Sequence, residues 1–296
     1  MKNRYHLSRK ENAFLAKKRW AESIYCGMKM ENRNVTFPQT QTILNGINAS
    51  SVGLDDIQAI LNMRDAWQYV LAHIDDVLDI SYLCKVQENV ARREALAWGE
   101  LRTGSIGISG VAYVPPVPEP KQAEKALRKV LSSPSSITEA ALNVFAWVAR
   151  SQLFWDGNKR TALLAANKVL IEGGAGILLV PEAHMTVFSA LLSSFYETGN
   201  SHKLKNFLYE TSILGIESFS SESVDSSLLP EQSLLDTETA RTSAWLKAKR
   251  MQVGLTQKSL AKATGIAVST IANIEQKQRK GSDEVWSRIE HYLNSL

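Results

Sequence analysis

The chain has 296 residues, of which 44% are hydrophobic and 22% are charged, and its formal net charge at pH 7 is +4. This balance excludes a wholly disordered or collagen-like chain, and the length allows two ordinary domains. No apolar run approaches the roughly 18–20 residues of a membrane-spanning helix, and Met1 to Trp20 lacks the apolar core of a secretory signal. We therefore expect a cytoplasmic protein with no membrane partner.

The first two thirds of the chain are predicted to be helical. Apolar residues recur at spacings of three and four in four segments, which are Leu54 to Leu71, Gln122 to Leu131, Ile137 to Ala149 and Thr161 to Glu172. Cys26 and Cys84 are too few for a disulfide framework or a four-thiolate zinc site, so we expect both to be buried apolar thiols. The predicted fold class is all-α.

One segment of the helical region alternates instead. Ser105 to Val114 reads SIGISGVAYV, with apolar residues at every second position apart from interruptions at Gly107 and Gly110, and prolines follow at positions 115, 116 and 118. This pattern predicts a short β-hairpin with an extended exit. Because an isolated hairpin is only marginally stable in water, we expect it to lie on the helices as a flap.

A polar segment, FWDGNKRT, joins two predicted helices at Phe154 to Thr161. A Gly-containing turn that leads into a helix directs several backbone N–H groups at one spot, where the helix dipole adds positive charge. The predicted nucleotide- or anion-binding residues are Asp156, Gly157, Asn158, Lys159 and Arg160. Asp156 is also a candidate Mg²⁺ ligand. The alternative is a plain helix start, capped by Asp or Asn.

These residues resemble the Fic/Doc (Fido) family, whose members have a helical fold and transfer AMP or, in the Doc branch, a phosphoryl group to protein hydroxyls. The family loop commonly reads H-P-F-x-D/E-G-N-G/K-R, and Gln152 to Arg160 reads QLFWDGNKR. Gly99 to Arg102, GELR, resembles the G-x-x-R segment that precedes the family's flap. The resemblance covers about Glu88 to Leu208 and implies ATP or another nucleotide with Mg²⁺ as the cofactor.

The resemblance also gives the predicted hairpin a function. In the family, the flap receives a protein target as an added strand, through main-chain hydrogen bonds. The flap residues implied here are Ser105, Ile106, Gly107 and Ile108. A hairpin that simply covers apolar surface is an equal alternative, because prolines such as those that follow it protect exposed strand edges.

Gln152 stands where the family has its catalytic histidine. An amide cannot accept a proton near neutral pH, whereas imidazole can, and general-base assistance is typically worth about 10²–10⁴-fold in rate. We therefore assign no catalytic residue, and rescue by His184 or His202 is the weaker alternative. The chain also lacks the second arginine that AMP-transferring members have after Arg160. In many members a regulatory glutamate pairs with that arginine, and Asn45 stands at the position of this glutamate.

The composition changes after residue 215. Positions 216–237 contain five acidic residues and no Lys or Arg, which predicts a linker. From Glu238 to the end, ten Lys and Arg stand against five Asp and Glu, a local balance of +5. We predict a Fic-like helical domain at 1–215, with N-terminal helices at 1–87 and the core at 88–215, then the linker and a basic domain at 238–296.

The basic domain is predicted to be helical at Thr242 to Gln252, Thr256 to Thr264, Val268 to Lys277 and Asp283 to Asn294. Its stretch GLTQKSLAKATGIAVSTIANIEQ resembles the Xre/Cro family of helix-turn-helix DNA-binding domains. The resemblance implies core positions at Leu260, Ala261, Ile266, Ile271 and Ile274, with Leu255, Val268 and Trp286 also in the core. It further implies that Arg250 and Glu275 form a structural pair.

Short polar side chains begin the second helix of this motif. Ser269, Thr270 and Asn273 can reach base edges once the helix enters the major groove. The other predicted DNA contacts are Gln257, placed like a family residue that bonds phosphate or a base, and the basic exit Lys277, Arg279 and Lys280. A solvated basic face is the alternative for the charges. Because one such domain makes a small interface, we expect a homodimer on double-stranded DNA.

Our leading hypothesis is a DNA-binding regulator whose Fic-like domain binds a nucleotide, another anion or a protein partner without the family's AMP transfer. The alternative is an active, toxin-like Fido-type transferase that AMPylates or phosphorylates a protein hydroxyl and represses its own promoter through the helix-turn-helix domain. A third hypothesis is that the basic N-terminal helices at Tyr5 to Lys29 contact nucleic acid, against the simpler interpretation of solvated helix faces.

Overall fold

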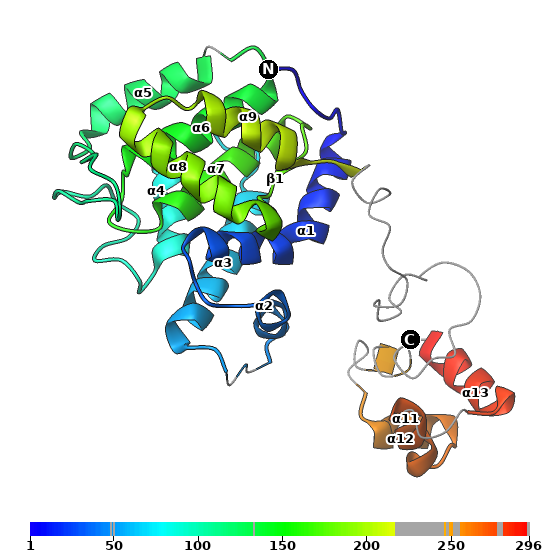
Figure 1. Cartoon of the computed structure of the whole chain (residues 1–296). Helices are drawn as coiled ribbons and strands as arrows, with labels where there is room; N and C mark the ends of the chain where they lie inside the picture. Colours follow the sequence, from blue (N-terminus) through cyan, green and yellow to red (C-terminus); the bar gives the residue numbers. More distant parts are fainter. Residues whose placement is uncertain are drawn as a thin grey trace. The chain divides into compact units, whose positions relative to one another are not determined.

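The computed structural model describes residues 1–47, 49, 51–132, 134–216, 246, 249–250, 255–276 and 281–294. The chain divides into two compact units, Met1–Ser223 and Val224–Leu296 (Figure 1). The division falls inside 216–237, the predicted linker, which lies outside the described residues apart from Ile216. The predicted helix at Thr242 to Gln252 also lies largely outside them.

The first unit is helical, as predicted. Its described α-helices are α1 (Arg9–Met30), α2 (Phe37–Leu44), α3 (Leu54–Ala72), α4 (Ile80–Ala91), α5 (Pro120–Ser132), α6 (Ile137–Ser151), α7 (Asn158–Glu172), α8 (Met185–Thr198) and α9 (His202–Thr211). A 3₁₀ turn, η1 (Glu182–His184), precedes α8. The four helices predicted from periodicity are α3, α5, α6 and α7, and each begins and ends within about three residues of the predicted bounds.

Helix α7 forms the centre of this unit. It contacts α1, α3, α4 and α6 (Figure 1), and 12 of its 15 residues are buried. Small residues such as Ala162, Ala165 and Ala166 let the neighbouring helices approach its backbone closely. Because α7 begins at Asn158, the polar loop before it is fixed by the packing of the whole unit.

Two buried asparagines complete a short antiparallel ladder beside α7. Strands β1 (Ile177–Leu178) and β2 (Ile213–Leu214) pair with Ile177 opposite Leu214. The Asn167 amide donates to the Leu178 carbonyl at 2.9 Å and accepts from the Leu178 N–H at 2.9 Å. Asn12 of α1 makes the same pair of bonds with Gly176, at 2.8 and 2.7 Å. Each amide therefore replaces a strand neighbour and satisfies buried backbone groups.

The predicted hairpin at Ser105 to Val114 is wrong, because β1 and β2 form the only ladder among the described residues. The segment keeps a turn, in which the Val111 N–H donates to the Ile108 carbonyl at 3.1 Å. Glycines at 104, 107 and 110 weaken a strand, and the prolines that follow have no N–H to donate to a ladder. Period-two alternation here marks an extended loop, which we call the 104–116 loop.

Arg102 closes the base of the 104–116 loop. Its guanidinium donates to the carbonyls of Gly104 at 2.5 Å, Pro115 at 3.2 Å and Pro116 at 2.5 Å. It also donates from Nε to the Gln152 carbonyl at 2.6 Å, and the side chain is almost fully buried. One arginine thus holds both ends of the loop against the end of α6, in place of strand pairing.

We expect Arg102→Ala to lower the free energy of unfolding by at least about 3 kcal/mol, because one buried and three partly buried carbonyls lose their donor. Urea denaturation of the purified chain measures this change. Arg128→Ala is the control, since its side chain is 78% exposed and pairs only with Glu124 on its own helix. Equal losses for the two variants would show that Arg102 is not a structural clamp.

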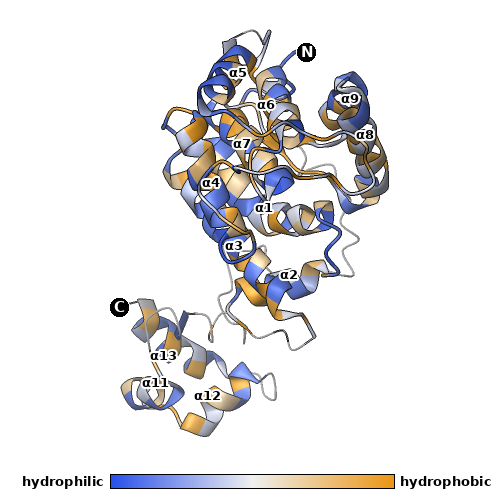
Figure 2. Ribbon diagram, turned by 90° about the vertical axis from the view of Figure 1, so that its left-hand side faces the viewer, coloured by the Kyte–Doolittle hydropathy of each residue, from blue (hydrophilic) through white to orange (hydrophobic). Residues whose placement is uncertain are grey.

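The second unit has α11 (Gln257–Thr264), α12 (Val268–Glu275) and α13 (Asp283–Asn294), each with hydrophilic and hydrophobic residues (Figure 2). Its buried core is Leu246, Leu260, Ala261, Ile266, Ile271, Ile274, Trp286, Ile289 and Leu293. The predicted core positions are therefore confirmed, and Leu255 packs partly buried against them. Val268 is the exception at 43% exposed, because the first residue of α12 points away from this core.

Two remaining expectations concern the thiols and the membrane. Cys26 is buried and Cys84 is half-buried, and neither forms a disulfide. Burial raises the pKa of the Cys26 thiol to about 12 and that of Cys84 to about 11, so both stay protonated at neutral pH. Within the described ranges, no helix is long and apolar enough to cross a bilayer.

Candidate functional site

The predicted anion-binding loop turns sharply between α6 and α7. Gln152, which ends α6, has a left-handed backbone with φ of 46° and ψ of 56°. Gly157, the residue before α7, has φ of 75°. A Cβ at position 157 would lie 2.8 Å from Cγ1 of Val90 on α4. Glycine is therefore required at position 157 both by its backbone conformation and by the close approach of α4.

Asn158 holds this loop in shape from inside. Its Oδ1 accepts from the Phe154 N–H at 3.0 Å, and its Nδ2 donates to the Phe154 carbonyl at 2.8 Å and to Gln152 Oε1 at 3.2 Å. The side chain is only 5% exposed. Both ends of the predicted ligand-binding amide therefore serve the loop itself.

Gln152, at the position of the family's histidine, is engaged in the same way. Its Nε2 donates to the Ala149 carbonyl at 2.7 Å, while its Oε1 accepts from Asn158. Among the described residues, no histidine hydrogen bonds to Gln152, Asp156 or Asn158. His184 instead packs edge-on against Phe207, with ring centroids 5.9 Å apart. No imidazole takes the place of the missing base in this geometry.

Lys159 and Arg160, the two predicted phosphate-binding cations, are paired with acids of the chain itself. Lys159 Nζ lies 2.9 Å from Glu31 Oε2 and donates to the Met30 carbonyl at 2.7 Å. Arg160 is 1% exposed, and its NH1 group lies 3.0 Å from Glu94 Oε1. Its Nε lies 3.7 Å from Glu31 Oε1. Burial opposes the Arg160 charge, but the Glu31 and Glu94 carboxylates outweigh it and raise the pKa of the guanidinium.

The ion pairs continue toward α3, and the charges balance. Glu94 also pairs with Arg33, which in turn lies 2.9 Å from Asp56. Asn62 donates to Glu94 Oε1 at 2.8 Å. We call this set of three cations and three carboxylates the acidic lock; its members are Arg33, Lys159, Arg160, Glu31, Glu94 and Asp56. The sequence does not predict the three carboxylates of this set, because Glu31, Asp56 and Glu94 lie far along the chain from the loop that contains Lys159 and Arg160.

The loop fits a bound nucleotide only in part. Gly157 offers no side-chain cap, and no described residue accepts a hydrogen bond from the backbone N–H groups of residues 158–160. The positive end of α7 therefore suits an anion. Asp156 is exposed and suits one Mg²⁺ coordination position, but its Oδ1 already accepts from the Gly157 N–H at 2.6 Å. No cluster of three or more metal-binding side chains occurs among the described residues. Lys159 and Arg160 do not fit the predicted role of phosphate-binding cations, because Glu31 and Glu94 neutralise them.

We expect Glu94→Gln to lower the free energy of unfolding by about 3 kcal/mol, because it leaves the buried Arg160 without its nearest carboxylate. Denaturant titration checks this value. Glu88→Gln, which breaks an exposed pair with Lys85, is the matched control and should cost less than about 1 kcal/mol. If Glu94→Gln is as mild as Glu88→Gln, the lock does not constrain the loop.

In the second unit, the predicted base-reading residues lie on the side of α12 away from the core. Ser269 is exposed, and Thr270 and Asn273 are half-buried. Ile271 and Ile274 on the opposite side are buried. Gly265, with φ of 68°, makes the turn from α11 into this helix. The polar positions are therefore free to face a groove.

Arg250 and Glu275 form the predicted structural pair. Arg250 donates from Nε to Glu275 Oε1 at 2.7 Å and from NH2 to Glu275 Oε2 at 2.9 Å. Gln257 donates to Glu275 Oε2 at 2.7 Å, a contact that the sequence does not predict and that ties its amide to this pair. The predicted phosphate contacts Lys277, Arg279 and Lys280 lie outside the described residues.

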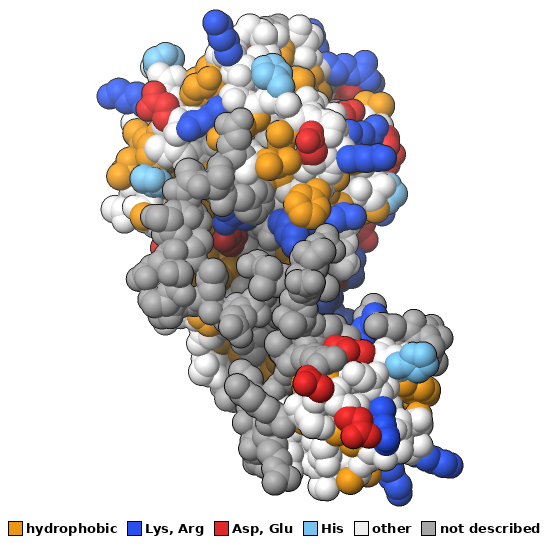
Figure 3. All heavy atoms as spheres, turned by 90° about the vertical axis from the view of Figure 1, so that its right-hand side faces the viewer, with side chains coloured by type: hydrophobic (Ala, Val, Ile, Leu, Met, Phe, Trp, Pro, Cys, Tyr) orange, Lys and Arg blue, Asp and Glu red, His pale blue; other side chains and the backbone are white. Residues whose placement is uncertain are grey.

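Three of the six basic residues of α1 are paired with acids. Arg9 pairs with Asp75, Arg19 lies 2.8 Å from Glu22, and Lys29 lies 3.8 Å from Glu182. On the face in Figure 3, the described Lys and Arg side chains alternate with acidic and apolar ones. These observations favour solvated helix faces over a nucleic-acid contact by the N-terminal helices.

Two segments of the chain match known protein families. Residues 77–170 match the Fic/DOC family, and residues 246–296 match the helix-turn-helix family. No curated protein matches the chain. The chain therefore combines a Fic domain with a C-terminal helix-turn-helix domain.

Solved structures share the fold of about two thirds or more of the chain. Fic-1 (residues 134–508) from C. elegans matches with a TM-score of 0.54 and 18% identity over 66% of this chain, which spans only 61% of that one. A Fic domain containing signaling protein from Bacteroides thetaiotaomicron matches with a TM-score of 0.54 and 18% identity, over 69% of this chain and 85% of that one. A Fic family protein from Desulfovibrio desulfuricans matches with a TM-score of 0.57 and 16% identity, over 90% and 78%. At these identities the likeness concerns the fold alone.

Proposed function

We propose that this protein is a DNA-binding regulator of the cytoplasm whose Fic domain no longer transfers AMP. The observation that carries the proposal is the hydrogen bonding of the Gln152 side chain. Its amide stands at the position of the family's base, and both its donor and its acceptor are used inside the loop. Without a group that can accept a proton, the attacking hydroxyl loses an assistance of about 10²–10⁴-fold.

The DNA-binding half of the proposal rests on the helix-turn-helix match and on the polar side of α12. Ser269 and Thr270 are placed at the start of that helix, where short side chains reach base edges in the major groove. Such a domain presents one small interface, so binding as a homodimer to two half-sites gives the required affinity.

We expect the double variant Ser269→Ala and Thr270→Ala to weaken binding to a selected duplex at least about 30-fold, since two base contacts worth roughly 1–3 kcal/mol each are lost. The duplex is selected from a random pool by the wild-type chain, and gel-shift titration measures binding. The matched control is Ser193→Ala with Ser194→Ala, two exposed serines of α8 in the other unit. Failure of the wild type to select any duplex would contradict the proposal.

We propose that the Asp156 to Arg160 loop still holds a nucleotide phosphate or another anion at the start of α7. The support is the uncapped helix end and the exposed Asp156 carboxylate, which suits Mg²⁺. The acidic lock opposes this binding, because Glu31 and Glu94 already neutralise Lys159 and Arg160. The loop is therefore a weak sensor rather than a tight catalytic cradle.

A protein target at the 104–116 loop is part of the same proposal. Ser105 to Ile108 is extended, with exposed and half-buried residues alternating and no ladder to use its backbone groups. Such a segment can receive another chain as an added strand without any chemistry.

We expect no transfer of label when the purified chain is incubated with labelled ATP and Mg²⁺, because position 152 offers no base. Gel autoradiography of the chain and of added cell extract measures transfer. Label that is transferred efficiently by the wild type and lost in Asn158→Ala would contradict the proposal and favour an active, toxin-like transferase.

A further inference from the structure

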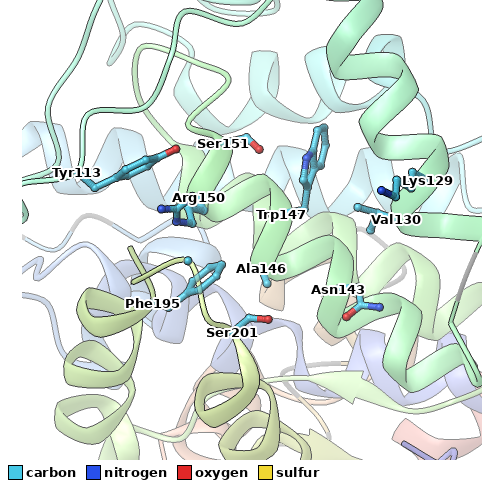
Figure 4. A pocket seen from close by; sticks show the side chains of 11 residues that line it. Tyr113, Lys129, Val130, Asn143, Ala146, Trp147, Arg150, Ser151, Phe195 and Ser201 are labelled. Carbon is cyan, nitrogen blue, oxygen red and sulfur yellow. The ribbon is translucent and has the colours of Figure 1, made fainter. Parts of the chain in front are cut away.

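A pocket of about 440 Å³ opens beside α6 (Figure 4). Its α6 lining includes Asn143, Trp147 and Arg150, which recur at spacings of three and four and form one face of the helix. Other residues of α6, such as Phe145 and Ala149, are fully buried and do not line the pocket. No residue from 152 to 160 lines the pocket, so it is a separate site.

Neighbouring groups hold the Arg150 side chain in one position in the pocket. The carbon of its guanidinium lies 3.8 Å from the centre of the Tyr113 ring, and its Nε donates to the Tyr196 carbonyl at 3.1 Å. Gly199 lies against the guanidinium, where a Cβ would be 3.4 Å from Cζ. Within the described part of the chain, no group accepts from the two terminal nitrogens. A guanidinium fixed in this way can donate two parallel hydrogen bonds at little entropic cost.

The charge around the pocket is positive. Lys129 also lines it and forms no ion pair among the described residues. Lys205 donates to Asn143 Oδ1 at 2.8 Å, which places a third cation at the wall. None of the described residues that line the pocket carries a carboxylate. An anion entering here therefore meets cations that are not already neutralised, in contrast to Lys159 and Arg160.

The walls are aromatic. Trp147, Phe195 and Tyr113 all line the space, and Figure 4 shows Trp147 and Phe195 flanking the stretch of α6 that carries Arg150. Flat apolar walls favour a planar ring, and the volume lies within the roughly 300–1,000 Å³ of pockets that bind small molecules. A charge receptor and aromatic surfaces thus converge in one cavity.

We propose that this pocket binds a small aromatic carboxylate. The carboxylate pairs with the Arg150 guanidinium, Lys129 adds longer-range attraction, and the ring lies against Trp147 and Phe195. This ligand site goes beyond the function proposed for the Fic loop and for DNA binding, and it depends on neither.

The test uses 2-naphthoate as the probe and the full chain, with isothermal titration calorimetry as the readout. We expect one molecule of 2-naphthoate to bind per chain, and the neutral 2-naphthamide to bind at least about tenfold more weakly. Equal binding of acid and amide, or no heat from 2-naphthoate up to its solubility limit, would overturn the proposal.

Variants locate the binding. Arg150→Gln should weaken 2-naphthoate binding at least about tenfold, and Trp147→Ala should weaken it as well. Because Arg150 also bonds Tyr196, Lys129→Gln is a second charge variant that leaves the packing intact and should weaken binding about two- to fivefold. Arg128→Gln, on the same helix as Lys129 but not in the lining, is the matched control and should bind as the wild type does. Unchanged binding in both Arg150→Gln and Lys129→Gln would place the probe elsewhere and refute this site.

Discussion

The buried Arg160 guanidinium constrains the loop before α7 and the helices around it. A charge with 1% exposure needs partners, and Glu94 and Glu31 supply them from the segment after α4 and from the end of α1. This pairing joins α1, α3, α4 and α7 around the loop through Arg33 and Asp56. The cations that the motif offers to a phosphate are thereby used to hold the unit together, and a ligand must compete with them.

The helices were predictable because their apolar spacing is local information. The periodicity of α3, α5, α6 and α7 places each helix close to its observed bounds. The sequence predicted the segment Ser105 to Val114 wrongly as a hairpin, because its alternation of apolar residues is equally compatible with an extended loop. What closes that loop is Arg102, which bonds Gln152 fifty residues later, and no local pattern encodes a contact of that range.

The candidate sites were predictable to a similar extent. The Fic/Doc-like loop motif predicts the position of Gln152 and the turn at Gly157. The helix-turn-helix motif predicts the buried face of α12 and the pair of Arg250 with Glu275. The acids Glu31 and Glu94 did not follow, since they lie in segments with no motif of their own. The aromatic pocket was missed for the same reason, because Tyr113 and Arg150 are brought together only by the fold.

Calorimetric titration of the chain with ATP and Mg²⁺ tests the central claim, that the loop is a restrained anion site without catalysis, most directly. Glu31→Gln removes the carboxylate nearest to Lys159, so this variant should bind at least about fivefold more tightly than the wild type, a change of roughly 1 kcal/mol. Tight binding by the wild type, unchanged in Glu31→Gln, would contradict the account. It would show that Lys159 and Arg160 serve the nucleotide despite their acidic partners.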